Sequence, residues 1–392
     1  MNATTELPEP GPDAIAHSDE LIRLIQSRIR AADGWLDFSE YMQLALYAPG
    51  LGYYSGGATK FGESGDFVTA PEVSPLFSRS LARAIEPASG AGKQILEFGA
   101  GTGAMAAGIL ATLSRDHALP DRYLILEVSG DLRARQRQTL GQRVPDLLPL
   151  VVWLDELPPP FDGAVLANEV VDALAVSRFR IVDDAAPVRA LGVSSDSGGF
   201  AWAERPAPAA LQERIETIES DAGQPLPPGF TSEVRMEMPG FVNSAASVLD
   251  SGIGLFIDYG LPRRDLYAPE RSDGTLLCHY RHRAHADPFF YPGLQDITAW
   301  VDFTALAEAA VAAGMRVDGY TTQASFLIAA GIEHEFLAAT EADTQTRLTL
   351  SREMQTLLMP AEMGEKFKVM WLGKGDAQLG PQFESIDQRH RL

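Results

Sequence analysis

Two short stretches of this chain carry residue types and spacings that suit chemistry. In residues 94–103, an apolar run contains one acid, Glu97, and ends in three alternating glycines. These are Gly99, Gly101 and Gly103. Glycine permits a sharp turn and lets a ligand approach the backbone closely. The apolar run is typical of a buried strand in a parallel sheet, and residues 104–110 follow as a predicted helix. The pattern therefore indicates a nucleotide-type binding edge at the carboxyl end of a central strand.

Three interpretations of this glycine turn are open. Gly99, Gly101 and Ala104 satisfy the G-x-G-x-x-G/A fingerprint of dinucleotide-binding dehydrogenases. Glu97 and Gly103 extend the pattern to acid-x-G-x-G-x-G, which resembles the first motif of class I S-adenosylmethionine (SAM) methyltransferases. A carboxylate gains by facing a cationic sulfonium ligand with a free amino group, whereas a pyrophosphate gains nothing from it. We favour SAM over NAD, and a purely structural turn is the third interpretation.

The second stretch is residues 168–174, which contain Asn168, Glu169 and Asp172 just past a predicted strand. If the segment after Asn168 is helical, the two acids are three residues apart and face the same way. Paired carboxylates suit a guanidinium, which offers a fork of N–H donors and stays protonated in water. They would orient it and take up the proton lost on methylation. The alternative is that Asn168 caps a helix whose first turn holds the acids.

Alternating strands and helices predict the scaffold that positions these residues. The expected strands are 94–98, 123–128, 151–154, 163–169, 254–260, 326–329 and 367–372. This order predicts an α/β fold with a doubly wound, mostly parallel, seven-stranded sheet. Ligands of such sheets bind at the carboxyl ends of the strands, where Glu127, Asp155 and Asp258-Tyr259 also fall. Glu127 is placed to accept bonds from two ribose hydroxyls, and Asp155 is equally well explained as a turn residue.

The domain organisation follows from the same pattern. We expect a disordered tail over 1–18, a helical and lid region over 19–88, a core of 89–176 with 250–376, an inserted substrate-side subdomain of β hairpins over 177–249, and a C-terminal tail over 377–392. The first helix is predicted over 21–29 with Ser18 as its N-cap. The loop over 52–72 mixes aromatics, glycines and acids, so it is either an ordered lid or an ordinary packed loop.

Composition limits the partners and the compartment. The chain has 392 residues and a formal charge of −21, which argues against a nucleic-acid partner and is compatible with a cationic protein. No apolar run is long enough to span a bilayer. The single cysteine, Cys278, excludes an intrachain disulfide and favours a reducing, cytoplasmic location. The N-terminal residues lack an apolar signal core and the Arg-rich character of a mitochondrial presequence. The histidines His279, His282 and His285 lie in a segment that Pro288 and Pro292 interrupt, so we expect no metal there.

Taken together, the motifs resemble the MidA-type class I SAM-dependent methyltransferases, a family that includes the mitochondrial complex I assembly-factor protein arginine methyltransferase. The matching stretches are 41–42 with 52–54, 65–72, 96–103, 167–169 with 172–174, 257–260, 281–283, 296–298 with 301–303, and 363–369. The resemblance implies a class I methyltransferase fold, SAM as cofactor, and methylation of an arginine in a respiratory complex I subunit. Val170-Val171 and Trp300 depart from the usual pattern near the expected acceptor site, so the resemblance bears more strongly on the cofactor than on the substrate.

These inferences define an expected site. Its catalytic residues are Asn168, Glu169 and Asp172. Its cofactor-binding residues are Gly65, Asp66, Thr69, Glu97, Gly99, Ala100, Gly101, Gly103, Glu127, Val128 and Asp155. The expected partner is a protein with an accessible arginine. A methyltransferase for a small molecule and an assembly chaperone that retains the SAM fold are the alternatives.

Overall fold

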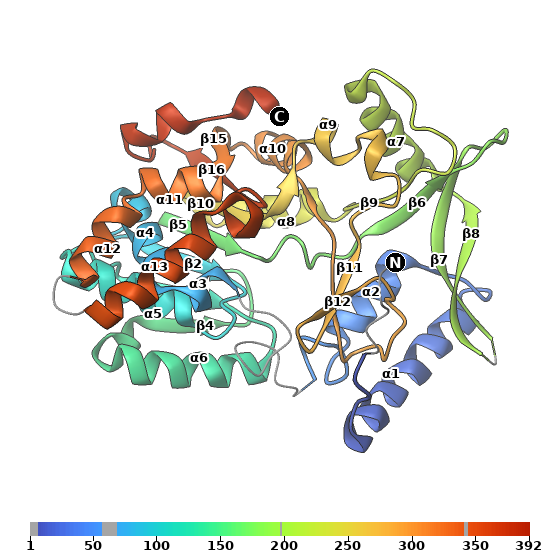
Figure 1. Cartoon of the computed structure of the whole chain (residues 1–392), viewed down its shortest axis with the longest axis horizontal. Coiled ribbons are helices and arrows are strands. Elements are labelled where there is room, and N and C mark those ends of the chain that lie inside the picture. The colour runs from blue at the N-terminus through green and yellow to red at the C-terminus, as the bar shows by residue number, and fades with distance from the viewer. Residues whose placement is uncertain (1–6, 57–68, 197, 341–343) are drawn as a thin grey trace. The chain divides into compact units, whose positions relative to one another are not determined.

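The computed structural model describes residues 7–196, 198–340 and 344–392, except for 57–68. The chain divides into two compact units. Unit 1 comprises residues 1–67, 173–237 and 263–300, and unit 2 comprises 68–172, 238–262 and 301–392. Figure 1 labels the elements of both units along the chain. In the described part of the chain, no helix combines the length and the apolar character that crossing a bilayer requires.

Unit 2 is built on a mixed sheet with one long path of seven strands. The order is β15 (Arg316–Thr322), β16 (Phe367–Lys374), β10 (Leu249–Leu261), β5 (Phe161–Asn168), β2 (Gln94–Phe98), β3 (Arg122–Leu126) and β4 (Val151–Leu154). From β10 to β4 all neighbours are parallel, whereas β16 is antiparallel to both β10 and β15. A short strand, β14 (Val301–Asp302), pairs with the end of β10. The parallel strands thus bring their carboxyl ends to one edge.

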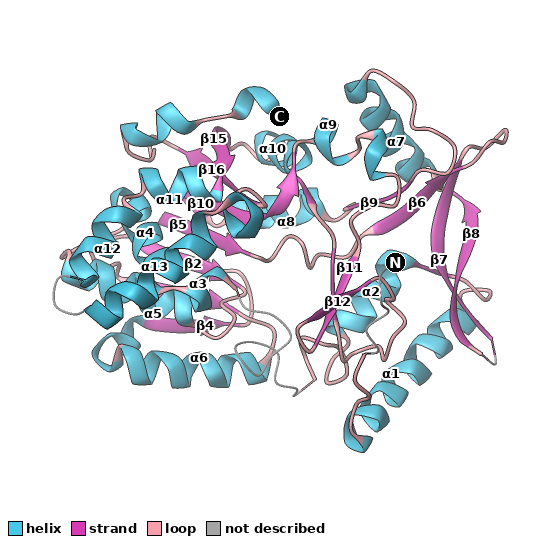
Figure 2. Cartoon of the chain, in the orientation of Figure 1, coloured by secondary structure: helices cyan, strands magenta, loops and turns pink. Residues whose placement is uncertain are grey.

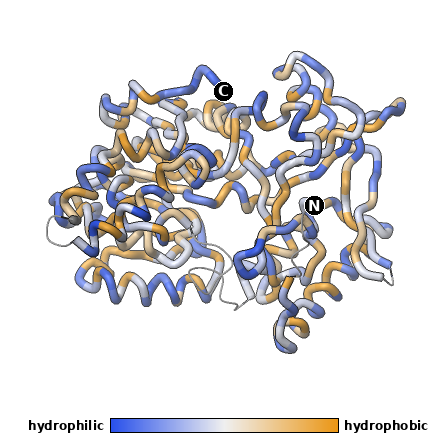
Figure 3. The backbone as a smooth tube through the Cα atoms, viewed as in Figure 1, coloured by the Kyte–Doolittle hydropathy of each residue, from blue (hydrophilic) through white to orange (hydrophobic). Residues whose placement is uncertain are grey.

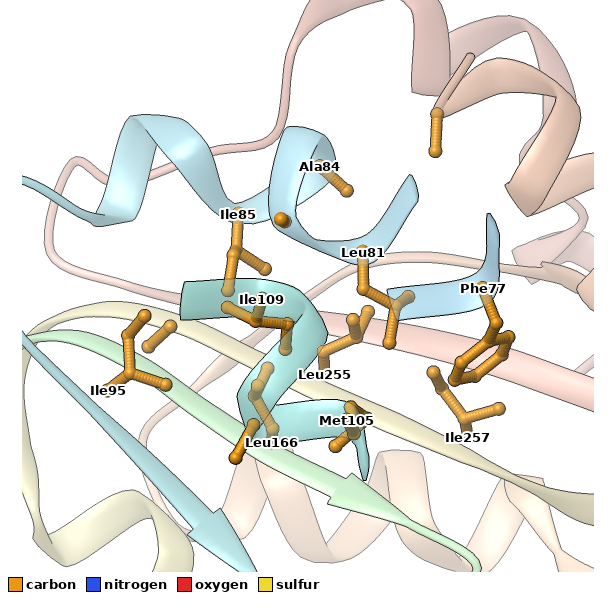
Figure 4. Packing of buried hydrophobic residues seen from close by; sticks show 14 of the residues in the cluster. Phe77, Leu81, Ala84, Ile85, Ile95, Met105, Ile109, Leu166, Leu255 and Ile257 are labelled. Carbon is orange, nitrogen blue, oxygen red and sulfur yellow. The ribbon is translucent and has the colours of Figure 1, made fainter. Parts of the chain in front are cut away.

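Helices cover this sheet and supply its core (Figure 2). They are α3 (Ala70–Val73), α4 (Pro75–Ile85), α5 (Ala104–Arg115), α6 (Gly130–Arg143), α8 (Met238–Ser247), α10 (Phe303–Ala312), α11 (Gln323–Ala329), α12 (Ile332–Thr340) and α13 (Thr344–Leu358). Short helical turns lie at Glu86–Ala88, Pro145–Leu150, Pro360–Gly364, Pro381–Ile386 and Arg389–Arg391. Figure 4 shows side chains of α4 and α5, such as Leu81 and Ile109, packed over Ile95, Leu166 and Leu255 of the sheet. Each such side chain contributes roughly 1.5–3 kcal/mol to the stability of the fold when fully buried. This packing holds the strands whose ends form the sheet edge.

Unit 1 has its own antiparallel sheet and its own core. The five-stranded sheet has the order β1 (Leu36–Asp37), β7 (Val188–Asp196), β6 (Ser177–Ile181) and β9 (Thr231–Val234), with β8 (Gly199–Pro206) paired to β7. A second sheet joins β12 (Arg283–His285), β11 (Leu277–Tyr280) and β13 (Asp296–Thr298). The helices are α1 (Pro12–Ala31), α2 (Phe38–Tyr47), α7 (Ala209–Ala222) and α9 (Arg263–Leu266), with a short turn at Pro269–Arg271. Polar and apolar residues alternate along α1 (Figure 3), and Leu21, Ile25 and Ile29 form its buried side.

The predicted α/β fold is confirmed, as are the strands that carry the motifs; the sheet has the seven strands of the long path and, in addition, β14. The prediction of a strand at 326–329 is wrong, because this apolar run lies in helix α11. Thr322 caps that helix by accepting a hydrogen bond from the Ser325 N–H at 3.3 Å. The sixth strand is instead β15, whose edge position tolerates the polar residues that hid it from the pattern.

The expected segments differ from the units at several points. Helix α1 begins at Pro12, so residues 12–18 are not a disordered tail, and Ser18 lies inside the helix rather than at its N-cap. The Ser18 hydroxyl is buried and donates to the Pro292 carbonyl at 2.9 Å. Helix α8, expected in the inserted subdomain, belongs to unit 2, and residues 263–300 belong to unit 1. Near the C-terminus, Phe383 is buried against Phe326 and Trp371 of unit 2.

Candidate functional site

The glycine turn between β2 and α5 depends on glycine for its backbone. Gly99, Gly101 and Gly103 have φ angles of 60°, 51° and 83°, a region that residues with a Cβ rarely adopt. A Cβ at Gly103 would lie 3.1 Å from the Gln136 Cα, whereas a Cβ at Gly101 would meet nothing within 4 Å. Helix α5 starts directly after Gly103 and has no side-chain cap. Its first N–H groups and the open side of Gly101 are therefore suited to a bound group with acceptor oxygens.

Glu97 lies inside β2, before this turn, and is only 1% exposed. Its Oε2 accepts a hydrogen bond from the Tyr123 hydroxyl of β3 at 2.7 Å. Burial raises the pKa of Glu97 to about 7; the Tyr123 hydrogen bond opposes this rise and the charge of Glu127 adds to it. Near neutral pH this carboxyl can thus gain a negative charge at little cost when a cation faces it.

Glu127 follows β3 and is held from two sides. Its Oε1 accepts the Ser129 N–H at 2.9 Å, and its Oε2 accepts the Gln136 side-chain N–H at 3.1 Å. Burial raises the pKa of Glu127, and these two hydrogen bonds lower it. The next residue, Val128, is apolar and 75% exposed. The corner after β3 therefore presents a fixed acid beside an uncovered apolar side chain.

Asp155 lies on the rim of this corner. Its Oδ1 is 2.6 Å from Arg133 Nη1, and its side chain is 87% exposed. Arg133 also donates to the carbonyl of Glu127 at 2.6 Å and to that of Leu154 at 2.5 Å. Arg133, which no motif in the sequence singles out, thereby ties the ends of β3 and β4 to α6.

The segment after Asn168 is a turn, so the helical spacing considered for Glu169 and Asp172 does not apply, and the N-cap alternative is wrong. Glu169 adopts a left-handed backbone conformation with φ 54°, which a helix excludes. The carboxylate of Asp258, at the end of β10, holds the turn. Its Oδ2 accepts the N–H groups of Val171 and Asp172 at 2.9 and 3.1 Å, and its Oδ1 accepts the Tyr259 N–H at 2.8 Å. Satisfying these donors from a neighbouring strand replaces the bonds that a helix would have made.

The Glu169 carboxyl lies in a small network of donors. Its Oε1 accepts from the Asn168 amide at 3.2 Å and from the Ala70 N–H at 3.3 Å, and its Oε2 accepts from the Tyr259 hydroxyl at 3.3 Å. The ring of Phe367 packs against that of Tyr259 with centroids 4.0 Å apart. Burial first, and then the nearby Asp172 carboxylate, raise the pKa of Glu169 to about 8.

Asn168 adds an acceptor to this network. It is 9% exposed, and its Oδ1 is buried with no hydrogen-bond partner among the residues that the structure describes. Buried polar atoms are rarely left in this condition, and a bound ligand is one explanation. The group formed by Asn168, Glu169 and Asp172 is therefore rich in acceptors and is suited to a cationic ligand that carries several N–H groups.

The remaining predicted residues are placed as follows. Thr69 precedes α3, and its carbonyl accepts the N–H groups of Glu72 and Val73. Gly65, Asp66 and most of the expected lid lie outside the described residues. His279 and His285 lie in β11 and β12 of unit 1. Among the described residues, no three His, Cys, Asp or Glu side chains are grouped to hold a metal.

The structure thus brings the two predicted clusters to the same edge of one sheet. Glu97, Glu127, Glu169 and Asp258 lie at or near the carboxyl ends of β2, β3, β5 and β10, and these four strands are consecutive in the order β10-β5-β2-β3. Sequence reasoning missed Gln136 and the bracing role of Asp258. Gln136 interrupts a seam of Leu132 and Leu140 at helical spacing, which is the signal that could have pointed to it.

Comparison with known proteins gives three concordant findings. The model of Methyltransf_28, a family of S-adenosyl-L-methionine-dependent methyltransferases, matches residues 79–321. The mitochondrial "protein arginine methyltransferase NDUFAF7 homolog" of Drosophila melanogaster is 28% identical over 96% of this chain and 90% of its own length. Its counterpart in Danio rerio is 29% identical over 89% of this chain and 85% of its own length.

The solved structures agree with the sequence matches. A crystal structure from Burkholderia thailandensis, bound to S-adenosyl-homocysteine, superposes with a TM-score of 0.92 at 44% sequence identity. It covers 99% of this chain and 100% of its own. A native structure of a protein from the same organism gives a TM-score of 0.90 at 44% identity.

Proposed function

Because the chain belongs to the Methyltransf_28 family of SAM-dependent methyltransferases, and SAM is therefore its cofactor, we propose that it methylates an arginine side chain of a protein. The observation that carries this proposal is the buried, acceptor-rich group of Asn168, Glu169 and Asp172 beside the glycine turn. Such a group favours an acceptor that is itself a multidentate cation.

The glycine corner fits SAM in four respects. The open side of Gly101 leaves room for a ligand that a Cβ would fill, and the uncapped start of α5 offers N–H donors to a carboxylate. Glu127 suits a ribose diol, and the exposed Val128 beside it suits an adenine ring. The proposed cofactor residues are Glu97, Gly99, Ala100, Gly101, Gly103, Glu127 and Val128, with Asp155 at the rim. Thr69, Gly65 and Asp66 stay predicted members of the site.

The acceptor residues have complementary roles. When bound, SAM supplies an electrophilic methyl group on a positively charged sulfur. Glu169 and Asp172 would hold the guanidinium by paired N–H···O bonds, and Asn168 Oδ1 would accept a further N–H and orient the reacting nitrogen. As the new N–C bond forms and the S–C bond breaks, the nitrogen loses a proton. Glu169, whose pKa is raised to about 8 by burial first and then by Asp172, is suited to receive it.

The names of the relatives bear on the kind of acceptor molecule and on the location of the protein. The curated relatives above are named as arginine methyltransferases of proteins, which supports a protein substrate. A respiratory complex I subunit is the acceptor that the MidA-type resemblance implies, and it stays a prediction. So does the cytoplasmic location, since the relatives are named as mitochondrial; a single, buried cysteine is in keeping with a reducing compartment.

Isotope transfer tests the function. The protein is incubated with methyl-labelled SAM and a lysate from a strain that lacks it, and the products are separated by size and analysed by mass spectrometry. We expect label on an arginine side chain of a protein. Label confined to small molecules, or on lysine, would overturn the assignment of the acceptor.

Two variants test the acceptor residues separately. Glu169→Gln and Asp172→Asn should bind S-adenosyl-homocysteine as the wild type does, because neither lies in the glycine corner, but should transfer little methyl. Glu156→Gln, on an exposed glutamate, is the matched control. If either site variant lost affinity for S-adenosyl-homocysteine, that residue would belong to the cofactor site instead.

A further inference from the structure

Gln136 is a polar residue at a core position. It lies on α6 between Leu132 and Leu140, and the three residues form the buried seam of that helix. Its side chain is fully buried. A leucine would satisfy the seam at lower desolvation cost, so the amide needs another explanation.

The Gln136 amide joins three separate parts of the sheet edge. Its Nε2 donates to the carbonyl of Gly101 at 3.0 Å and to Glu127 Oε2 at 3.1 Å. Its Oε1 accepts the indole N–H of Trp153, in β4, at 2.9 Å. Its backbone lies close to Gly103, where even a Cβ would approach its Cα to 3.1 Å. One side chain therefore connects the glycine turn, the acid after β3 and the strand β4.

These bonds fix the position of Glu127 and influence its pKa. A carboxylate with its two oxygens held by Ser129 and Gln136 cannot rotate away, and each oxygen retains a lone pair for another donor. Burial raises the pKa of Glu127, and the Gln136 hydrogen bond opposes this rise. An unbraced acid in the same place would be mobile and more easily protonated.

We propose that Gln136 is a positioning residue for the cofactor. It holds Glu127 and the glycine turn in the arrangement that binds the adenosine half of SAM, so this arrangement exists before SAM binds. This inference rests on the proposed role of Glu127 and the glycine turn in binding SAM. Preorganisation of this kind raises the affinity, because the side chains that contact the ligand need not lose conformational entropy when it binds.

The proposal predicts that the affinities for three ligands change together. SAM, S-adenosyl-homocysteine and adenosine share the part of the ligand that Glu127 would hold, so removing the Gln136 amide should weaken all three by a similar factor. The methyl group reacts at the other end of SAM. The KM for SAM should therefore rise, while kcat at saturating SAM changes little.

The experiment compares Gln136→Leu with Gln138→Leu, a matched change at an exposed position of the same helix. Titration calorimetry should show binding of S-adenosyl-homocysteine and of adenosine weakened roughly 10- to 100-fold in Gln136→Leu, as loss of a hydrogen bond to a charged group predicts. Gln138→Leu should bind both as the wild type does. The affinity of Gln136→Leu should also begin to fall at a higher pH than that of the wild type on acidification, because its Glu127 is more easily protonated.

A second variant guards against loss of fold. Trp153→Phe removes only the indole N–H that orients the amide, and should give a smaller loss of affinity in the same direction. Wild-type affinity and an unchanged pH profile in Gln136→Leu, or in Trp153→Phe if the former does not fold, would overturn the inference. The proposed cofactor site on which this inference rests fails in a different way, namely if the wild-type protein binds no S-adenosyl-homocysteine or if Glu127→Gln binds it normally.

Discussion

Glu169→Gln should stabilise the free protein while it abolishes methyl transfer. In the folded protein, burial and the neighbouring Asp172 raise the pKa of Glu169 from 4.5 to about 8. As pH rises above 4.5, the carboxyl ionises in the unfolded chain before it can ionise in the folded one. The unfolded state is thereby favoured, and stability falls between pH 4.5 and 8. A glutamine cannot ionise and escapes this loss.

The magnitude follows from the same pKa values. A difference of about 3.5 in pKa, at about 1.4 kcal/mol for each unit, corresponds to roughly 5 kcal/mol above pH 8 and roughly 3 kcal/mol at pH 7. The glutamine can keep the existing hydrogen bonds, because its Oε1 can accept from Asn168 and Ala70 while its Nε2 donates to the Tyr259 hydroxyl. The gain should therefore not be offset by a lost partner.

Urea denaturation of the free protein at a series of pH values from 4.5 to 9 measures this effect. The free energy of unfolding of Glu169→Gln should equal that of the wild type at pH 4.5 and exceed it increasingly up to about pH 8. Glu156→Gln, on an exposed glutamate, should match the wild type throughout. Parallel curves for wild type and Glu169→Gln would show that the site does not hold a desolvated acid, and the argument for a cationic acceptor would lose its basis.

Three further predictions test the sheet edge. Gly101→Ala should abolish binding of S-adenosyl-homocysteine, measured by calorimetric titration, and should lower the free energy of unfolding by about 1–2 kcal/mol. The control Gly34→Ala, which also has a positive φ and open surroundings, should lower the free energy of unfolding by the same amount and leave binding intact. Tyr123→Phe removes a hydrogen bond that lowers the pKa of Glu97, and the pKa of Glu97 should therefore rise above about 7. The affinity for SAM should weaken at pH 7 and recover by pH 9, and an unchanged pH profile would refute this role for Glu97. Asp258→Asn places an amide N–H₂ against two N–H donors, so the free energy of unfolding should drop by roughly 2–4 kcal/mol and methyl transfer should be lost. The control Asp250→Asn, at the exposed start of the same strand, should leave both unchanged.

The sequence alone determined the features whose causes are local. Three glycines at alternate positions after a buried run require a tight turn, and the φ angles of Gly99, Gly101 and Gly103 confirm it. The strands that end near Glu127 and Asn168 were predictable because continuous apolar runs between helices belong to parallel sheets. Since parallel strands share one carboxyl edge, these patterns also indicate that the acids lie along the same edge.

The tertiary structure decided what depends on contacts between distant residues. The turn over 169–172 could not be distinguished from a helix in the sequence, because nothing nearby in the chain indicates that Asp258, 86 residues beyond Asp172, accepts its N–H groups. The strand β15 was missed because an edge strand needs no continuous apolar run, and its place is set by pairing with β16. Gln136 was missed in the sequence, where its only signal is a break in a leucine seam; its role depends on Gly101, Glu127 and Trp153, which meet around it. Local patterns thus determine where the chain turns and which residues are available, whereas hydrogen bonds between remote segments determine how those residues are held.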